Sequence, residues 1–194
     1  MVAALVALAA AAAPRIAVAQ DCPTAQSGAH GFVVERSERQ KTDVFHGGEG
    51  IVRTVMRVDG KSLLEKTLFE GLFDLDRLDR GRRTKYEPRT DLKALFPLKP
   101  GRQASAKFIS ESDGNYGRVY VELDVKKPED LYIGPCKYSV LRIERSLSRS
   151  AVPPQYAYTE LYSPELKLIL GREYRHADGR TNLVKFDRIY LLKN

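Results

Sequence analysis

The sequence has few of the side chains from which metal and redox sites are built, with two cysteines and three histidines among 194 residues. Cys22 and Cys136 stand far apart, so there is no Cys-x-x-Cys motif, and zinc or thioredoxin-like chemistry is a poor fit. His30, His46 and His176 lie beside glycines or close to a turn sequence. Because a metal site needs several ligands placed by rigid elements, we expect neither a metal site nor a cofactor.

Recognisable catalytic motifs are also missing. The chain contains no Gly-x-Ser-x-Gly elbow, no phosphate-binding glycine loop and no His-Glu-x-x-His sequence. Asp43 and His46 could together bind a metal ion or act as a base, but solvated loop residues are the better interpretation. Ser163 precedes Pro164, and a proline there favours a turn over a nucleophile. We therefore expect no catalytic residue and a protein that is not an enzyme.

Only one long hydrophobic run occurs, and it lies at the N-terminus. Residues 1–13 are almost entirely Ala, Val and Leu, and residues 17–19 form the small-x-small pattern that signal peptidase cleaves. The run has no positive charge at its start, since Arg15 follows it, which leaves a buried helix or a membrane anchor as alternatives. It is shorter than the roughly 20 apolar residues of a spanning helix. We expect a signal peptide over residues 1–19 and one mature domain over residues 20–194, with no transmembrane segment after cleavage.

The two cysteines take their meaning from this prediction of export. An exported protein meets oxidising conditions, under which two isolated cysteines favour a disulfide bond. We expect Cys22 to pair with Cys136 and to tie the start of the mature chain to the middle of the domain. Two unpaired thiols are the alternative.

Turn and strand patterns predict an all-β protein. Asp-Gly pairs at residues 59–60, 113–114 and 178–179 each separate two β-prone runs, and Asp-Gly is a strong signal for a tight hairpin turn. From Val119 to Lys126, apolar and polar residues alternate, as in a strand with one dry and one solvated face. The patterns predict about nine or ten strands in an antiparallel meander that forms a curved, partly closed barrel or a sandwich after an N-terminal signal helix.

Two segments carry further expectations. The residues from Thr181 to Leu192 have apolar side chains on both faces, which predicts a central strand or one covered on both sides. A short helical turn is expected between Thr90 and Leu95.

Positive charge is concentrated in one segment. Between Arg77 and Arg102 there are nine Lys or Arg residues against three acids, in what is predicted to be a long connection at about residues 71–102. Such a segment could bind an anionic surface, namely lipid, lipopolysaccharide or an acidic envelope protein. Nucleic acid would satisfy the same charges, but an exported protein rarely meets it. A solvated loop that aids solubility is the alternative. The residues predicted to make this contact are Arg77, Arg80, Arg82, Arg83, Lys85 and Arg89.

Tyrosine is abundant in the predicted strands, and its amphipathic ring suits a ligand cleft. Tyrosine is also an ordinary strand former, so core and cross-strand packing is the better interpretation. The residues concerned are Tyr132, Tyr138, Tyr156, Tyr158, Tyr162, Tyr174 and Tyr190.

The second half of the chain carries a recurring order of turns and strands. Residues 95–101 read Leu-Phe-Pro-Leu-Lys-Pro-Gly, a glycine at 134 leads into a strand that ends near Ile143, and residues 161–167 read Leu-Tyr-Ser-Pro-Glu-Leu-Lys. In this order they resemble a set of exported, β-rich proteins of Gram-negative bacteria that carry a domain of unknown function. The resemblance covers residues 92–194 and departs at Pro135-Cys136, where a small residue and an aromatic one are expected. It implies a periplasmic protein with an all-β fold, and it implies no catalytic residue.

Two functions are compatible with these features. The first is a non-enzymatic periplasmic protein that binds an apolar ligand, a lipid or an envelope protein on a curved β-sheet. The second is a structural or docking module of the envelope that acts through residues 77–102 and has no ligand cavity. The inner side of the sheet discriminates between them, because a cleft favours binding and a filled interior favours docking.

Overall fold

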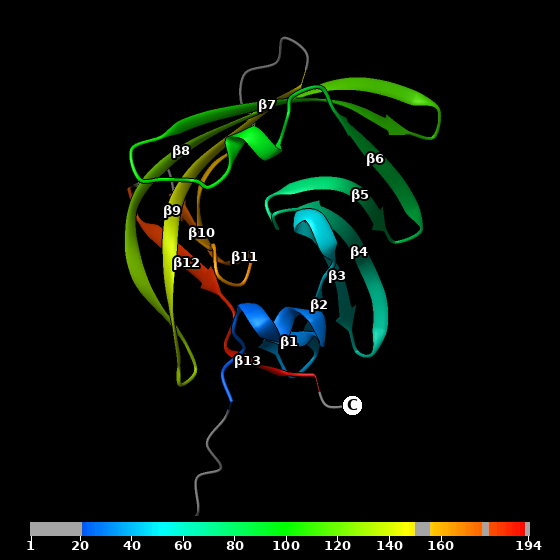
Figure 1. Ribbon diagram of the computed structural model, residues 1–194. Helices are drawn as coiled ribbons and strands as arrows, with labels where there is room; N and C mark the ends of the chain where they lie inside the picture. Colours follow the sequence, from blue (N-terminus) through cyan, green and yellow to red (C-terminus); the bar gives the residue numbers. More distant parts are fainter. Residues whose placement is uncertain (1–20, 150–155, 176–178, 193–194) are drawn as a thin grey trace, which may run out of the picture.

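The computed structural model describes residues 21–149, 156–175 and 179–192. It contains thirteen strands in one sheet (Figure 1). In chain order these are β1 (Phe32–Ser37), β2 (Gln40–His46), β3 (Ile51–Val58), β4 (Lys61–Phe69), β5 (Phe73–Asp79), β6 (Arg82–Pro88), β7 (Gln103–Ser112), β8 (Asn115–Ile133), β9 (Cys136–Arg149), β10 (Tyr156–Ser163), β11 (Leu168–Arg175), β12 (Thr181–Lys185) and β13 (Arg188–Leu191). Short 3₁₀ turns occur at Ala25–Ala29, Gly48–Gly50 and Lys93–Leu95.

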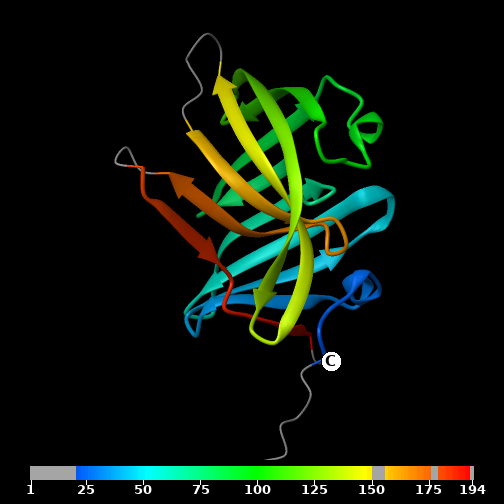
Figure 2. The same cartoon turned by 90° about the vertical axis from the view of Figure 1, so that its left-hand side faces the viewer.

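The sheet is an antiparallel meander in which each strand from β1 to β11 pairs with the next along the chain. It curls so that β8–β11 and β3–β6 lie on opposite sides, and β8 and β9 are long, bent strands (Figures 1 and 2). The predicted all-β, curved meander is therefore confirmed, whereas the signal helix falls outside the described residues. No helix in the described part of the chain is long and apolar enough to cross a membrane.

Tight turns with positive φ connect several strands. Asp59 and Gly60 have φ values of 50° and 77°, and Asp113 and Gly114 have 53° and 76°, so both predicted Asp-Gly turns are confirmed. The third predicted turn includes Asp178, which lies outside the described residues. Arg80-Gly81 forms a further turn of the same kind, with φ values of 50° and 85°.

That turn corrects the expected connection at residues 71–102. Residues 73–88 form the β5–β6 hairpin, and the connection proper begins after Pro88 and contains the expected short helical turn, at Lys93–Leu95. The hairpin was missed because charged residues occur on both faces of β5 and β6, and the apolar alternation that begins at Phe73 and Leu75 does not continue to the end of β5.

The segment from Thr181 to Leu192 is not the central strand that its apolar pattern predicts. β12 pairs with β11 and β13 pairs with β1, so the segment supplies both ends of the sheet, which do not pair with each other. Between them, the Phe186 amide donates to the carbonyl oxygen of Leu170 at 3.3 Å, and the Asp187 amide donates to that of Glu35 at 2.7 Å. The chain therefore changes its partner strand midway, which a sequence pattern cannot show.

The β10–β11 hairpin divides the buried core into two clusters. Leu161 packs in a cluster with residues of β1–β3 such as Phe32 and Val44, while its neighbour Tyr162 packs in a cluster with residues of β7–β9 such as Phe108 and Ile143. Adjacent residues of one strand point to opposite faces. Both faces of this hairpin are therefore buried at its turn end.

The predicted disulfide between Cys22 and Cys136 is present, with the two Cα atoms 5.6 Å apart. It fastens the residues before β1 to the start of β9. Tyr138 strengthens the same connection, because its hydroxyl donates to the carbonyl oxygen of Pro23 at 3.1 Å.

Candidate functional site

Contacts between distant strands define an inner face of the sheet. Arg145 of β9 donates from Nη1 to the carbonyl oxygen of Leu72, in the β4–β5 turn, at 2.9 Å. Tyr162 of β10 donates its hydroxyl to the carbonyl oxygen of Glu70, in the same turn, at 2.8 Å. β9 and β4 are not neighbours in the sheet, so these bonds cross the space that the sheet encloses.

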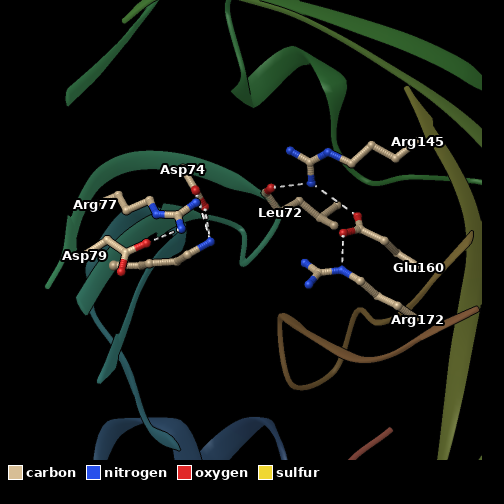
Figure 3. Close-up of polar contacts among 8 residues, drawn as sticks. Leu72, Asp74, Arg77, Asp79, Arg145, Glu160 and Arg172 are labelled. Carbon is tan, nitrogen blue, oxygen red and sulfur yellow. Dashed lines mark hydrogen bonds and ion pairs between the residues drawn. The ribbon is translucent and has the colours of Figure 1, made fainter. Parts of the chain in front are cut away.

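A buried charged triad lies on this inner face (Figure 3). Glu160 has a side-chain exposure of 0% and accepts a hydrogen bond from Arg145 Nη1 at 3.2 Å and one from Arg172 Nε at 3.1 Å. The side chain of Arg145 is 10% exposed and that of Arg172 is 40% exposed. One carboxylate on β10 is thus shared by two arginines from the strands that flank it, β9 and β11, and the side chain of Arg145 is nearly dry while that of Arg172 is partly exposed.

The electrostatics of the triad favour the charged form of both arginines. Burial lowers the pKa of Arg145, but the attraction of Glu160, followed by that of Tyr158 and Asp74, outweighs it, so the pKa lies above the usual value for arginine. For Arg172 the same balance of burial against Glu160 and Tyr158 also leaves the pKa raised. Two positive charges therefore persist at this place.

A second charged group lies on the facing strands β4 and β5 (Figure 3). Lys66 Nζ contacts both carboxylate oxygens of Asp74 at 3.0 Å, and Arg77 Nη2 contacts Asp79 at 2.6 Å. The hydrogen bond from Arg77 holds the pKa of Asp79 below its usual value. Each cation in this group has its own carboxylate, so the group is internally neutral.

Two tyrosines extend the inner face away from the β10–β11 turn. The rings of Tyr158 and Tyr174 have centroids 6.0 Å apart, and the Arg172 guanidinium lies 5.4 Å from the centroid of Tyr158. Burial and Glu160 raise the pKa of Tyr158, so its hydroxyl stays protonated at neutral pH. Tyr174 is exposed, whereas Glu160 is fully buried. Solvent access therefore increases from the triad outward along β10 and β11.

Of the other tyrosines predicted as candidate cleft residues, those whose side chains are described have different roles. Tyr138 and Tyr162 are buried, Tyr190 donates its hydroxyl to Glu35 in β1, and Tyr132 is exposed. The side chain of Tyr156 lies outside the description. The packing interpretation thus holds for the buried pair, while Tyr158 and Tyr174 continue the inner face beyond the triad.

The predicted basic residues lie on β5, β6 and the start of the connection that follows. Four of the six form ion pairs, which join Arg77 to Asp79, Arg82 to Asp113, Arg83 to Asp76 and Arg89 to Glu87. Arg80, at the turn, and Lys85 form no ion pair with a described residue. Most of the positive charge that the sequence concentrates here is therefore balanced by acids from the same or a neighbouring strand.

His46 is not the solvated loop residue that was expected. It ends β2, and its Nε2 donates to the carbonyl oxygen of Leu166 at 2.9 Å. Burial lowers the pKa of His46 although this bond opposes the shift. Asp43 bonds to Arg57 instead. In the described part of the chain, no group of three or more His, Cys, Asp or Glu residues is placed to hold a metal ion.

The outer face of β7–β9 has a shallow groove of about 600 Å³. Its walls are polar and include Gln103, Glu122, Asp124 and Glu144. Lys126 binds both Asp124 at 2.6 Å and Glu144 at 3.2 Å. The groove is therefore not the apolar cleft that binding of an apolar ligand would require.

Sequence reasoning missed the triad of Arg145, Glu160 and Arg172. Its one local signal is that Arg145 shares a strand face with the apolar residues Ile143 and Leu147. A charged residue at such a position is expected to have a buried partner. That partner comes from another strand, so the sequence alone does not identify it.

Comparison with known proteins gives little. No family model matches the sequence, and a search of curated proteins finds no match. The fold is similar to the crystal structure of the hypothetical lipoprotein YmcC from Escherichia coli, with 8% sequence identity and a TM-score of 0.49 over 82% of this chain and 81% of that chain. The resemblance of residues 92–194 to exported β-rich proteins stays a prediction.

Proposed function

We propose that this protein is an exported, non-enzymatic binding protein whose ligand lies against the inner face of the curved sheet. The observation that carries the proposal is the gradient on β9–β11, from the buried Glu160 through Arg172 to the exposed Tyr174. Binding sites combine a few convergent polar groups with aromatic rings, and this face offers both.

The energetics of the triad support a role beyond folding. Removing charges from water is expensive, and well-packed apolar side chains of similar size often stabilise a core as well or better. An ion pair with two arginines for one carboxylate, nearly dry at Arg145, is a poor choice for stability alone. We take it as a recognition element.

The chemistry of the inner face changes the kind of ligand that is expected. A wholly apolar molecule placed against Arg172 and the Lys66–Asp74 pair would remove water from these charges without replacing its hydrogen bonds. A ligand with a polar or charged part fits better, whether it is a small molecule or the head of a lipid.

The disulfide supports export. Disulfide bonds persist in oxidising compartments such as the periplasm and are rare in the cytosol. The pairing of Cys22 with Cys136 also begins only two residues after residue 20, so it is compatible with a mature chain that starts there.

Docking through the basic segment is the less well supported alternative. Ion pairs with acids occupy Arg77, Arg82, Arg83 and Arg89, so few charges are left to attract an anionic surface. Roughly 1 kcal/mol of attraction is expected for each basic residue at such a surface. Of the six predicted contact residues, Arg80 and Lys85 are the two without an ion pair to a described residue, and two such charges would give a weak contact.

The proposal is tested by native mass spectrometry of protein purified from the periplasm without denaturation. The wild-type protein should carry a bound molecule, and Tyr174→Ala should lose it. Tyr132→Ala is the matched control, because Tyr132 is also exposed but belongs to β8, outside the inner face group. A wild-type protein without any bound molecule, or equal retention by both variants, would contradict the proposal.

A further inference from the structure

We infer that Arg145 and Arg172 form a site for an oxyanion, a carboxylate or phosphate group of the ligand. This inference rests on the proposed function and specifies its ligand class. It is argued from unused hydrogen-bond donors, from local charge and from access.

Arg145 and Arg172 have N–H donors that Glu160 and Leu72 do not occupy. A guanidinium group has five N–H donors. Glu160 accepts hydrogen bonds from Nε of Arg172 and from Nη1 of Arg145, and Nη1 of Arg145 also donates to the carbonyl oxygen of Leu72. In the described part of the chain, Nε of Arg145 is buried and has no hydrogen-bond partner. Neither Nη group of Arg172 donates to a residue in the described part of the chain, and the side chain is 40% exposed.

A buried donor without a partner is unfavourable, by about 1–3 kcal/mol and more when the group is charged. The side chain of Arg145 is only 10% exposed, so bulk water reaches it poorly. A ligand oxygen that accepts from Nε of Arg145 would remove the penalty. The free protein is thus organised for an acceptor that it does not itself provide.

The charged groups on the two sides of the inner face differ in net charge. On the β4–β5 side, Lys66 is neutralised by Asp74 and Arg77 by Asp79. On the β9–β11 side, two arginines share Glu160 as their carboxylate. Among these described side chains one positive charge is therefore left over, and it lies at the triad. A ligand with a single negative charge would neutralise it.

Because both cations are arginines, we expect the ligand group to be a carboxylate or a phosphate. The planar fork of arginine matches the two oxygens of a carboxylate or phosphate, and such bidentate bonds are stronger than neutral ones. The two arginines lie on β9 and β11, on either side of β10, and share Glu160 as acceptor, so a ligand anion would approach from the side of Arg172, whose side chain is the more exposed. Tyr158, whose ring lies 5.4 Å from Arg172, offers a flat surface to the part of the ligand that carries the anion.

The test is calorimetric titration of the full mature protein at constant, low ionic strength. The probes are inorganic phosphate and sodium D-glucuronate, with D-glucose as the neutral counterpart of the latter. We expect saturable binding of at least one of the two anions and none of glucose. Binding of phosphate alone indicates a phosphate-bearing ligand, and binding of glucuronate alone indicates a carboxylate-bearing one.

Arg172→Gln should weaken binding of the anion at least about tenfold, a loss of about 1.4 kcal/mol. Arg142→Gln is the control, because Arg142 belongs to β9, carries the same charge and pairs with Glu129 and Glu173 on the other face. Its affinity should stay within about twofold of the wild type. Arg172→Lys keeps the charge but not the fork, and it tests the same contact if the glutamine variant does not fold.

Absence of saturable binding for both anions, or an equal loss in the Arg172 and Arg142 variants, would overturn the inference. These results are distinguishable from failure of the proposed function. If native protein carries a molecule that Tyr174→Ala loses, but neither anion binds, the inner face is a binding site and only the oxyanion class is wrong.

Discussion

Arg172 and Glu160 face each other across the β10–β11 ladder, with Nε and Oε1 3.1 Å apart. The pair is asymmetric in its environment, because the carboxylate is fully buried and the guanidinium is open to solvent. Arg145 approaches the other oxygen of the same carboxylate from β9. Glu160 is therefore the residue that holds two cations of the inner face in place.

We predict that Glu160→Gln destabilises the protein strongly, by about 3–5 kcal/mol, because it leaves two guanidinium groups without their shared counter-charge. Urea unfolding at pH 7 measures the change in the free energy of unfolding. Glu129→Gln is the control, since Glu129 pairs with Arg142 where both side chains are partly exposed, and its expected loss is at most about 1 kcal/mol. Equal losses in the two variants would contradict the structural role assigned to Glu160.

A second prediction concerns the close approach of the β4–β5 turn to the β10–β11 turn. A Cβ atom at Gly71 would lie 1.7 Å from the carbonyl oxygen of Lys167, and φ at Gly71 is +68°. Gly71→Ala should therefore cost about 3 kcal/mol or more, because backbone must move. Gly60 has a φ of +77° but open space around it, so Gly60→Ala should cost only about 1 kcal/mol.

Thermal unfolding of the two alanine variants makes this comparison. If Gly60→Ala proved as harmful as Gly71→Ala, backbone conformation alone would explain the loss. The contact between the two turns would then have no measurable weight.

A third prediction concerns the disulfide. Replacing both Cys22 and Cys136 with alanine should lower the free energy of unfolding by about 2–5 kcal/mol, since the bond closes a long loop in the unfolded chain. Chemical denaturation with and without reductant measures the effect. The wild type should respond to reductant and the double variant should not. An unchanged midpoint of the wild type after complete reduction would refute the prediction.

The pH dependence of stability follows from His46. Its pKa is lowered in the folded state by burial, so between the ordinary value of 6.5 and the lower folded value the unfolded chain binds more protons. Stability is therefore complete above pH 6.5 and is lost as the pH falls below it. Urea unfolding at pH 7 and pH 5 should show this loss in the wild type and a smaller loss in His46→Gln.

His30→Gln is the matched control, because His30 is exposed. It should keep the wild-type difference between pH 7 and pH 5. A His46→Gln protein with the same pH dependence as the wild type would show that other groups are responsible.

The parts of this fold that could be predicted from the sequence are those with a local cause. The Asp59-Gly60 and Asp113-Gly114 turns follow from the tolerance of these residues for positive φ, and the strand through Val119–Val125 follows from strict alternation. The disulfide followed from the number of cysteines once export was assumed. Each of these features needs information only from neighbouring residues or from composition.

The parts that could not be predicted depend on non-local contacts. The β5–β6 hairpin, turned by Arg80-Gly81, is charged on both faces, and its strands are recognisable only by their ladders. The partner change at Phe186 is set by Leu170 and Glu35, far away in the chain. For the same reason the triad was hidden, because Arg145, Glu160 and Arg172 come from three strands.

The central claim is that the inner face, not the basic hairpin, carries function. Native mass spectrometry of periplasmic protein can compare Tyr174→Ala with the double variant Arg80→Glu and Lys85→Glu. The double variant reverses the charge of the two predicted basic contact residues that have no ion pair with a described residue. The bound molecule should be lost from the tyrosine variant and retained by the charge-reversed one. Loss from the charge-reversed variant with retention by Tyr174→Ala would contradict it.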